Sequence, residues 1–322
     1  MTTKSMPKIV VPGDDPVQIT GSPHLDRLSE FGEIVIFSDR PETDEEKVRR
    51  LHDADVLINS RGAVKWPGSV LNRLPRLRFI TVCGIGTDPI DLQTARKQGV
   101  VVSNIPGKTA PVVAEHSLCL MCAAAKRVAF QTAELKEGRW TRQENILLAG
   151  KTLGIVGAGP IGSHMAKLGR AIGMHVIAWT FNPTDERAED LGVRFVELDE
   201  LLRTSDVVSL HVKLTEESRH MIGKRELELM KPGGLLVNTA RGAVVDTNAL
   251  VESLNSGQLA GAALDVFEAE PLPSDDPMLH CEQLVLTPHA ADQTPEGLDL
   301  LNEGVVDNVI AFLEGRPRNI VT

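Results

Sequence analysis

The stretch Lys151–Gly162, which reads K-T-L-G-I-V-G-A-G-P-I-G, decides the fold that this chain predicts. Its apolar half predicts a β-strand, its glycine-rich half predicts a turn, and the following residues Ser163–Ile172 are compatible with a helix. In such a turn Gly157 permits the tight bend, Gly159 lets a pyrophosphate approach the backbone, and Gly162 lets the helix lie close to the strand. A glycine turn alone often marks only a bend, but with both flanking patterns present it predicts a dinucleotide-binding unit.

The size and charge of the chain restrict its class. Its 322 residues suffice for two domains, and a content of 42% hydrophobic and 24% charged residues is typical of a globular protein. The net charge of −10 repels phosphate backbones and anionic membranes, which argues against nucleic acid and membrane partners. There is no signal-peptide pattern at the N-terminus and no run of about 18 apolar residues, so a cytoplasmic location is expected.

The cysteines do not predict a disulfide framework, because there are only 4 of them in a chain of this size. Cys119 and Cys122 form a C-x-x-C pattern inside an apolar helical segment, with no second ligand pair downstream. A zinc site is the less favoured reading, and we expect these two residues to be buried as small apolar side chains. No metal site is predicted.

Strand and helix patterns alternate along most of the chain, which predicts an α/β fold with parallel sheets covered by helices on both faces. The alternation runs from Lys8 to Ser103 and resumes after the glycine turn as far as Thr287. Pro111–Glu137 predicts one long uninterrupted helix, which either bridges two domains or packs against its own copy in a homodimer. The last predicted helix, Pro295–Glu314, has no further strands to cover, so we expect it to pack back on the first domain.

These patterns predict two doubly wound domains, one of them discontinuous. Residues 1–104 and 290–322 form a predicted flavodoxin-like substrate domain, and residues 105–289 form a Rossmann dinucleotide-binding domain inserted into it.

Three polar residues directly follow apolar runs of the second domain, where ligands of parallel sheets bind. They are Arg241, Glu270 and His289. An arginine can hold a carboxylate with two hydrogen bonds, a histidine can give a proton to a carbonyl oxygen, and a paired carboxylate raises the pKa of that histidine. These groups suit a 2-oxo acid as substrate. Taken singly, each also has an ordinary structural interpretation as a surface ion pair, a solvated loop acid or a hydrogen-bonded histidine.

Besides the glycine turn, the chain contains a series of longer motifs. They are V-C-G-I-G-T-D-P-I-D-L (82–92), N-I-P-G-K-T-A-P-V-V-A-E-H (104–116), L-K-E-G-R-W (135–140), L-H-V-K-L-T-E-E-S-R-H-M-I-G (210–223), N-T-A-R-G-A-V-V-D (238–246), A-L-D-V-F-E-A-E-P-L-P (263–273) and T-P-H-A-A (287–291). With these motifs in family order, the chain resembles the D-isomer-specific 2-hydroxyacid dehydrogenases, a family that includes glyoxylate and hydroxypyruvate reductases and phosphoglycerate dehydrogenases. The resemblance covers nearly everything from Asp55 to the end.

The resemblance implies a role for each matching residue. Arg241 would hold the substrate carboxylate, His289 would be the general acid in reduction, and Glu270 would stabilise its protonated form. The amides of Ile85 and Gly86 would also bind the carboxylate. The residues implied in cofactor binding are Gly157, Gly159, Pro160, Ile161 and Gly162 of the turn, with Thr109, Val113, Thr180, Thr239, Ala240 and Asp265.

The cofactor is predicted to be NAD or NADP. Many NAD-dependent members of the family carry aspartate at the position of Thr180, and its carboxylate binds the ribose hydroxyls and repels a 2′-phosphate. Without that carboxylate NADP stays open, and Lys213 or Arg187 is a candidate contact for its phosphate, with a solvated surface cation as the alternative. The frequency of NAD within the family favours NAD.

Arg61 follows a predicted strand of the first domain and is a candidate contact for the distal anionic group of a substrate, with a surface arginine as the alternative. The predicted function is an NAD(P)-dependent oxidoreductase that transfers a hydride between nicotinamide and a small 2-oxo or D-2-hydroxy acid, with a glyoxylate or hydroxypyruvate reductase favoured. The alternatives are a phosphoglycerate dehydrogenase-like enzyme and a dinucleotide-sensing binding module of the same fold.

Overall fold

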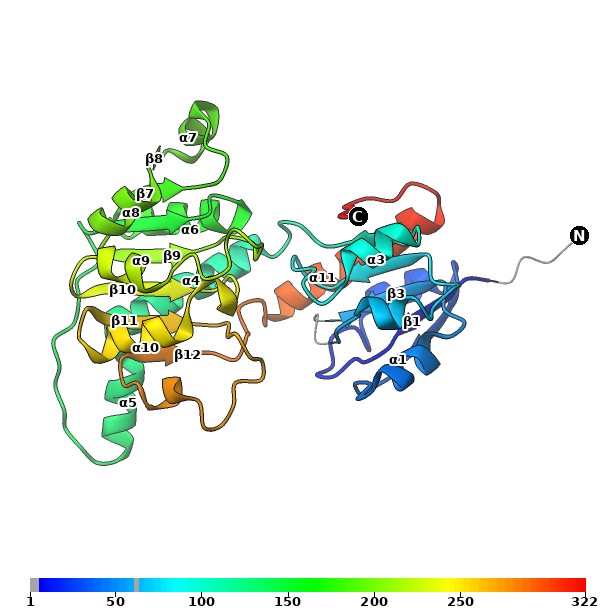
Figure 1. Ribbon diagram of the computed structural model, residues 1–322, viewed down its shortest axis with the longest axis horizontal. Coiled ribbons are helices and arrows are strands. Elements are labelled where there is room, and N and C mark those ends of the chain that lie inside the picture. Colours follow the sequence, from blue (N-terminus) through cyan, green and yellow to red (C-terminus); the bar gives the residue numbers. More distant parts are fainter. Residues whose placement is uncertain (1–5, 61–63) are drawn as a thin grey trace, which may run out of the picture. The chain divides into compact units, whose positions relative to one another are not determined.

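The structure is a computed structural model that describes residues 6–60 and 64–322. The chain divides into two compact units, of which unit 1 comprises Met1–Thr109 with Gln293–Thr322 and unit 2 comprises Ala110–Asp292 (Figure 1). Arg61 lies outside the described residues.

Unit 1 is built on a parallel sheet that, within its described residues, has the strand order β2-β1-β3-β4-β5. This is the flavodoxin-like order, in which the direction of winding reverses beside the first strand. The strands are β1 (Lys8–Val11), β2 (Glu33–Ile36), β3 (Val56–Asn59), β4 (Phe79–Val82) and β5 (Val101–Ser103). The helices are η1 (Pro23–Leu28), α1 (Asp44–Leu51), α2 (Gly68–Leu71), α3 (Leu92–Lys97) and α11 (Pro295–Leu313).

Helix α11 covers one face of this sheet although it comes from the far end of the chain. Val305 and Val309 are fully buried in one cluster with Ile9 and Ile58, and the ring of Phe312 stacks on that of Phe79 at 4.4 Å between centroids. The alternating side chains of the same strands face a second cluster on the other side of the sheet, beside α1 to α3. Both faces are therefore covered, as the apolar strand patterns require.

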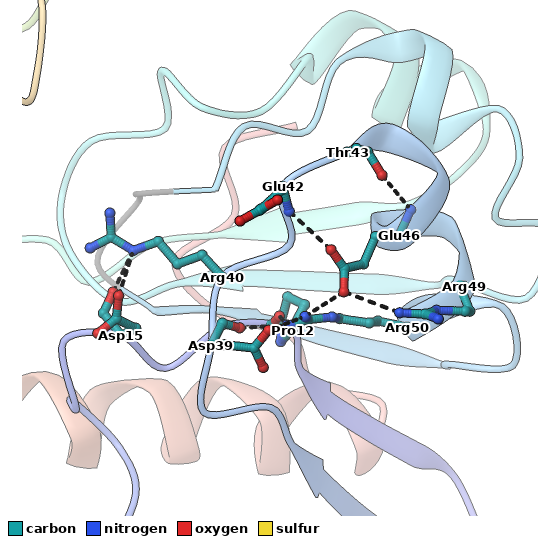
Figure 2. A network of polar contacts seen from close by, with 9 residues as sticks. All are labelled: Pro12, Asp15, Asp39, Arg40, Glu42, Thr43, Glu46, Arg49 and Arg50. Atoms are coloured by element: carbon teal, nitrogen blue, oxygen red, sulfur yellow. Dashed lines mark hydrogen bonds and ion pairs between the residues drawn. The ribbon is translucent and has the colours of Figure 1, made fainter.

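A buried arginine fixes the loops at the carboxyl ends of β1 and β2 (Figure 2). The guanidinium of Arg50, on α1, donates to the carbonyl oxygens of Pro12 at 2.7 Å and Asp39 at 2.5 Å and pairs with the carboxylates of Asp39 and Glu46. Its side chain is only 3% exposed, whereas the neighbouring Arg49 contacts the same Glu46 and is 77% exposed. The two loops thus depend on a single desolvated cation.

We expect Arg50→Met to lower the free energy of unfolding by about 2–3 kcal/mol, because two carbonyl groups lose their donor in a buried place. The matched control is Arg49→Met, for which a change within about 0.5 kcal/mol is expected. Urea unfolding followed by circular dichroism measures both. Equal effects of the two variants would contradict the assignment of Arg50 as the loop anchor.

Unit 2 is built on a second parallel sheet, with the order β12-β11-β10-β9-β6-β7-β8 among the described residues. Winding reverses between β6 and β9, which is the Rossmann arrangement. The strands are β6 (Thr152–Val156), β7 (His175–Trp179), β8 (Arg194–Phe195), β9 (Val207–Leu210), β10 (Gly234–Asn238), β11 (Leu259–Leu264) and β12 (Leu284–Leu286). The helical elements are α4 (Ala110–Ala125), α5 (Val128–Lys136), α6 (Pro160–Ala171), α7 (Asp185–Leu191), α8 (Leu198–Thr204), α9 (Lys224–Leu229), η3 (Gly242–Val244), α10 (Thr247–Asn255) and η4 (Pro277–His280). The predicted α/β class with two parallel sheets is confirmed.

The prediction of one uninterrupted helix over Pro111–Glu137 is wrong. Helix α4 ends at Ala125 and α5 begins at Val128, with Arg127 in the left-handed region at φ 49° between them. The chain returns beside this break, where the Ile146 amide donates to the Ala125 carbonyl and the Lys126 ammonium donates to the Ile146 carbonyl. These tertiary contacts replace the helical hydrogen bonds that are lost at the break.

The expectation that Cys119 and Cys122 are buried is also wrong. Cys119 is exposed, and Cys122 is only partly buried where it packs against the cluster that α4 forms with α6 and the sheet. Over the described ranges 6–60 and 64–322, no helix has both the length and the apolar character needed to cross a membrane.

Candidate active site

The glycine turn between β6 and α6 has the geometry needed to hold a pyrophosphate. Gly157 has φ 102°, and a Cβ at Gly162 would lie 2.0 Å from the Gly157 carbonyl oxygen, so both positions require glycine. At Gly159, by contrast, a Cβ would meet nothing within 4 Å, so open space lies beside this backbone at the start of α6. Pro160 occupies the first turn of the helix, and the amides at a helix N-terminus suit an anion. The turn therefore fits a dinucleotide.

The end of β7 carries no carboxylate, because Thr180 follows Trp179 directly. The guanidinium of Arg187, on α7, reaches back to the glycine turn, where it donates to the Ala158 carbonyl at 3.0 Å, and it also donates to the Asn182 carbonyl. Lys213 is exposed. Arg187 thus joins the loop after β7 to the turn that would hold the pyrophosphate.

Arg241 lies in the turn that follows β10, and Asn238 shapes this turn. The Asn238 side chain accepts from the Ala240 amide at 3.0 Å and donates to the Arg241 carbonyl at 2.9 Å. Thr239 is nearly buried, and its hydroxyl is 2.7 Å from that of Ser117 on α4. The turn is fixed at both ends, so the Arg241 side chain starts from a defined backbone position.

Glu270 and His289, at the carboxyl ends of β11 and β12, form a hydrogen-bonded pair. The Nδ1 atom of His289 donates to Glu270 Oε2 at 2.7 Å, and Glu270 Oε1 accepts from the Phe267 amide at 2.9 Å. The bond to Glu270 raises the pKa of His289 against the opposing effects of burial and of Arg241. Burial works against the Glu270 carboxylate, yet its bonds to His289 and Phe267 lower its pKa overall. The arrangement stabilises an imidazolium. Because Nδ1 is bonded to Glu270, Nε2 is the ring nitrogen that can interact with a substrate.

Asp265 holds the turn that carries His289. Its side chain is 1% exposed and accepts from the Thr287 hydroxyl at 2.6 Å and from the amides of Ala290 and Ala291 at 2.8 and 3.0 Å. The His289 amide donates to the Asp265 carbonyl, and His289 adopts φ 52°. Burial opposes the Asp265 carboxylate, but these bonds, with the one to His116, lower its pKa.

Sequence reasoning missed His116 as part of this cluster. Its Nε2 atom lies 3.1 Å from the Thr287 hydroxyl and 3.4 Å from Asp265 Oδ1. The signal was its position at the end of the N-I-P-G-K-T-A-P-V-V-A-E-H motif, on the helix that also carries the predicted residue Val113. Asn238 and Glu268 were likewise contained in quoted motifs without an assigned role.

In unit 1, the predicted residues Ile85 and Gly86 lie in the loop Cys83–Thr87, which follows β4 and is held by hydrogen bonds to its backbone. The Cys83 amide donates to the Asn59 carbonyl at 3.0 Å, and the Asn104 side chain donates to the Ile85 carbonyl at 2.7 Å. Gly86 is the next residue of this loop. Thr109, the last residue of the first segment of this unit, is 3% exposed.

The structure thus brings Arg241, Glu270 and His289 to one edge of the unit 2 sheet, since β10, β11 and β12 are successive neighbours in it. Ile85, Gly86 and Thr109 belong to unit 1. Within the described residues there is no group of three or more His, Cys, Asp or Glu side chains that could hold a metal ion.

Comparison with known proteins gives one consistent result. The model of the D-isomer specific 2-hydroxyacid dehydrogenase NAD binding domain matches residues 118–291. The chain is 39% identical over 305 residues to a glyoxylate reductase of Korarchaeum cryptofilum, covering 92% of each protein. It is 41% identical to a hydroxypyruvate reductase of Thermotoga maritima, covering 87% of this chain and 92% of the relative. A solved structure of the NADPH-dependent glyoxylate/hydroxypyruvate reductase of Sinorhizobium meliloti, in complex with NADP and malonate, matches with a TM-score of 0.86 and 28% identity over 99% of this chain and 97% of that one.

Proposed function

The chain belongs to the D-isomer-specific 2-hydroxyacid dehydrogenase family, and on that premise we propose that it reduces a small 2-oxo acid of the glyoxylate or hydroxypyruvate type to the 2-hydroxy acid. It is an NAD(P)-dependent oxidoreductase that acts on CH–OH groups. The observation that carries the proposal is the pairing of His289 with Glu270 at 2.7 Å, one strand away from Arg241 at the same sheet edge.

Each residue of this group has a separate task in the reaction. The guanidinium of Arg241 binds the substrate carboxylate and draws electron density from the adjacent carbonyl. His289 donates a proton from Nε2 to the carbonyl oxygen, and Glu270 stabilises the imidazolium before the transfer and orients the ring throughout. A nicotinamide cofactor, when bound, would supply the hydride for C2 of the substrate. One hydride and one proton convert the carbonyl group to the alcohol.

The two units divide this work. Unit 2 binds the cofactor through Gly157, Gly159, Pro160, Ile161 and Gly162 at the pyrophosphate and through Thr239, Ala240, Val113 and Asp265 near the nicotinamide. Of the residues of unit 1, the proposal assigns the amides of Ile85 and Gly86 to the substrate carboxylate and Thr109 to the nicotinamide. We retain Arg61 as the candidate contact for the distal end of the substrate. Unchanged Michaelis constants for anionic substrates in an Arg61→Ala variant would refute this contact.

The test is the loss of dihydronicotinamide absorbance with glyoxylate, hydroxypyruvate, pyruvate and an aromatic 2-oxo acid, each with NADH and NADPH. We expect the highest kcat/KM with glyoxylate or hydroxypyruvate. Cofactor binding without turnover on any of the acids would contradict the proposal and favour a dinucleotide-sensing module.

The preferred dinucleotide under this proposal is NAD, with NADP accepted more weakly. Thr180 does not repel a 2′-phosphate, but Arg187 is already engaged by two backbone carbonyls and is flanked by Asp185 and Glu186 at the start of α7. A phosphate placed there would meet the two carboxylates as well as the cation.

We expect Arg187→Gln to raise the KM for NADH and NADPH by similar factors of roughly fivefold, the equivalent of about 1 kcal/mol, because the lost hydrogen bond supports the turn that both cofactors use. The control Lys213→Gln should leave both constants unchanged. If either variant raised the KM for NADPH alone, that residue would instead be assigned to the 2′-phosphate, and the preference for NAD would be contradicted.

The proposal includes a homodimer formed through the region of α4 and α5 and a cytoplasmic location. Large apolar side chains, each at least 50% exposed, gather on α5 and in the segment after it: Val128, Leu135, Trp140 and Leu147. Such side chains are typical of a surface that a partner covers. Sedimentation equilibrium of the whole protein tests the dimer, and cell fractionation tests the location.

A further inference from the structure

The loop after β11 carries Glu270, which pairs with His289, and it also contains a second glutamate, Glu268. The proposed reaction does not use Glu268. Glu268 Oε1 accepts from the Thr247 hydroxyl at 2.7 Å and from the Thr247 amide at 3.2 Å. Glu268 Oε2 lies 3.2 Å from His220 Nε2. We call residues 265–271 the Glu270 loop and residues 239–247 the Arg241 turn.

The two partners of Glu268 are both fixed to the Arg241 turn. Thr247 is the last residue of this turn and the first of α10, where Asp246 caps the helix. His220 donates its amide to the Ala243 carbonyl at 2.8 Å. The Glu268 carboxylate therefore connects the Glu270 loop to the Arg241 turn at two places.

The Glu270 loop and the Arg241 turn also contact each other directly, and no side chain would fit between their backbones. A Cβ at Gly242 would lie 1.9 Å from the carbonyl carbon of Phe267, so the backbone beside Arg241 rests directly on the backbone beside Glu268. The Phe267 amide in turn donates to Glu270 Oε1, and Glu270 Oε2 accepts from His289. A displacement of Phe267 would consequently move the Glu270 carboxylate relative to both His289 and Arg241.

We infer that Glu268 is a positioning residue: through Thr247 and His220 it presses the Glu270 loop onto the Arg241 turn and sets the distance between the Glu270 carboxylate and the His289 ring. The inference rests on the proposed function for its kinetic consequence, but the contacts that carry it do not involve substrate or cofactor. The simpler interpretation is a surface ion pair, since the side chains of His220 and Glu268 are 43% and 37% exposed. Such a pair contributes little to stability, and its removal would leave the His289 ring unaffected.

The first measurement is the titration of the His289 ring by NMR in the protein without ligands. The charged groups that act on this ring are Glu270, Arg241 and Asp265. In Glu268→Ala the Glu270 carboxylate loses its fixed place, so the pKa of His289 should fall toward the ordinary value of 6.5. In Glu268→Gln the side-chain oxygen can still accept from Thr247, so the wild-type titration should largely return. The control is Glu252→Ala, which removes another exposed carboxylate of unit 2 that pairs with Lys224.

The second measurement is kinetic. Glu268→Ala should lower kcat about tenfold, because small displacements of catalytic groups are costly, with little change in the KM for the dinucleotide. Thr247→Val, which removes only the hydroxyl, should change kcat and the His289 titration in the same direction and serves in place of Glu268→Ala should that variant fail to fold.

A His289 titration and a kcat in Glu268→Ala that match those of Glu252→Ala would overturn the inference. The failure of the proposed function is a distinct result: wild-type protein without turnover on any 2-oxo acid would refute the reductase, while the ring titration would still decide whether Glu268 positions the pair.

Discussion

His289→Ala is expected to lower kcat for the reduction of glyoxylate or hydroxypyruvate by about 10³-fold. In the proposed reaction the imidazole gives a proton to the carbonyl oxygen, and general acid catalysis typically contributes about 10² to 10⁴ in rate. Dinucleotide binding should stay intact, because the glycine turn lies at β6 and α6 and makes no use of His289. Stopped-flow absorbance measures the rate, and fluorescence titration with NADH measures the binding. Retention of more than about a tenth of the wild-type kcat would exclude His289 as the acid.

The hydrogen bond between His289 and Glu270 determines the direction in which the rate of the same reaction changes with pH. In the proposed reaction the reduction needs protonated His289, and Glu270 raises the pKa of this ring above its usual value of 6.5. The rate should therefore be constant at low pH and fall as the pH rises through that elevated pKa. Glu270→Gln removes the charge that favours the imidazolium, so the fall should begin at lower pH. If the pH–rate profile of Glu270→Gln were not shifted, a group other than His289 would be responsible for the fall of the rate at high pH.

Arg241→Lys is expected to lower kcat/KM for the 2-oxo acid by about 10²-fold, although the charge is kept. Lysine cannot form the two parallel hydrogen bonds that a guanidinium makes with a carboxylate, and the loss of such a contact costs about 3 kcal/mol. The position is demanding because Asn238 fixes the backbone on both sides of Arg241. Initial rates at saturating dinucleotide give the parameter.

The control for Arg241→Lys is Arg225→Lys, on α9 of the same unit, which exchanges a surface arginine that pairs with Asp199 and Glu226. Its kcat/KM should equal that of the wild type. A comparable loss in both variants would point to an effect on folding and not on substrate binding.

The sequence by itself determined the fold class and the choice of candidate catalytic residues. Gly157 and Gly162 of the 151–162 stretch have no substitute, since Gly157 has a positive φ and Gly162 has no room for a Cβ, and constraints of this kind are local and visible in the sequence. Arg241, Glu270 and His289 became candidates because polar residues directly after apolar strands of a parallel sheet lie at one edge, and the structure has β10, β11 and β12 as successive neighbours.

Only the tertiary structure decided where helices break and what holds the catalytic residues in place. The long helix predicted over Pro111–Glu137 has no local signal for its end, because the break at Arg127 is stabilised by the returning segment at Ile146. Likewise, nothing near Glu268 in the sequence indicates Thr247 or His220 as its partners, which are 21 and 48 residues away. Periodicity and turn chemistry act over a few residues, whereas contacts between strand ends form only after the chain has folded, and for that reason the support of the site could not be read from the sequence.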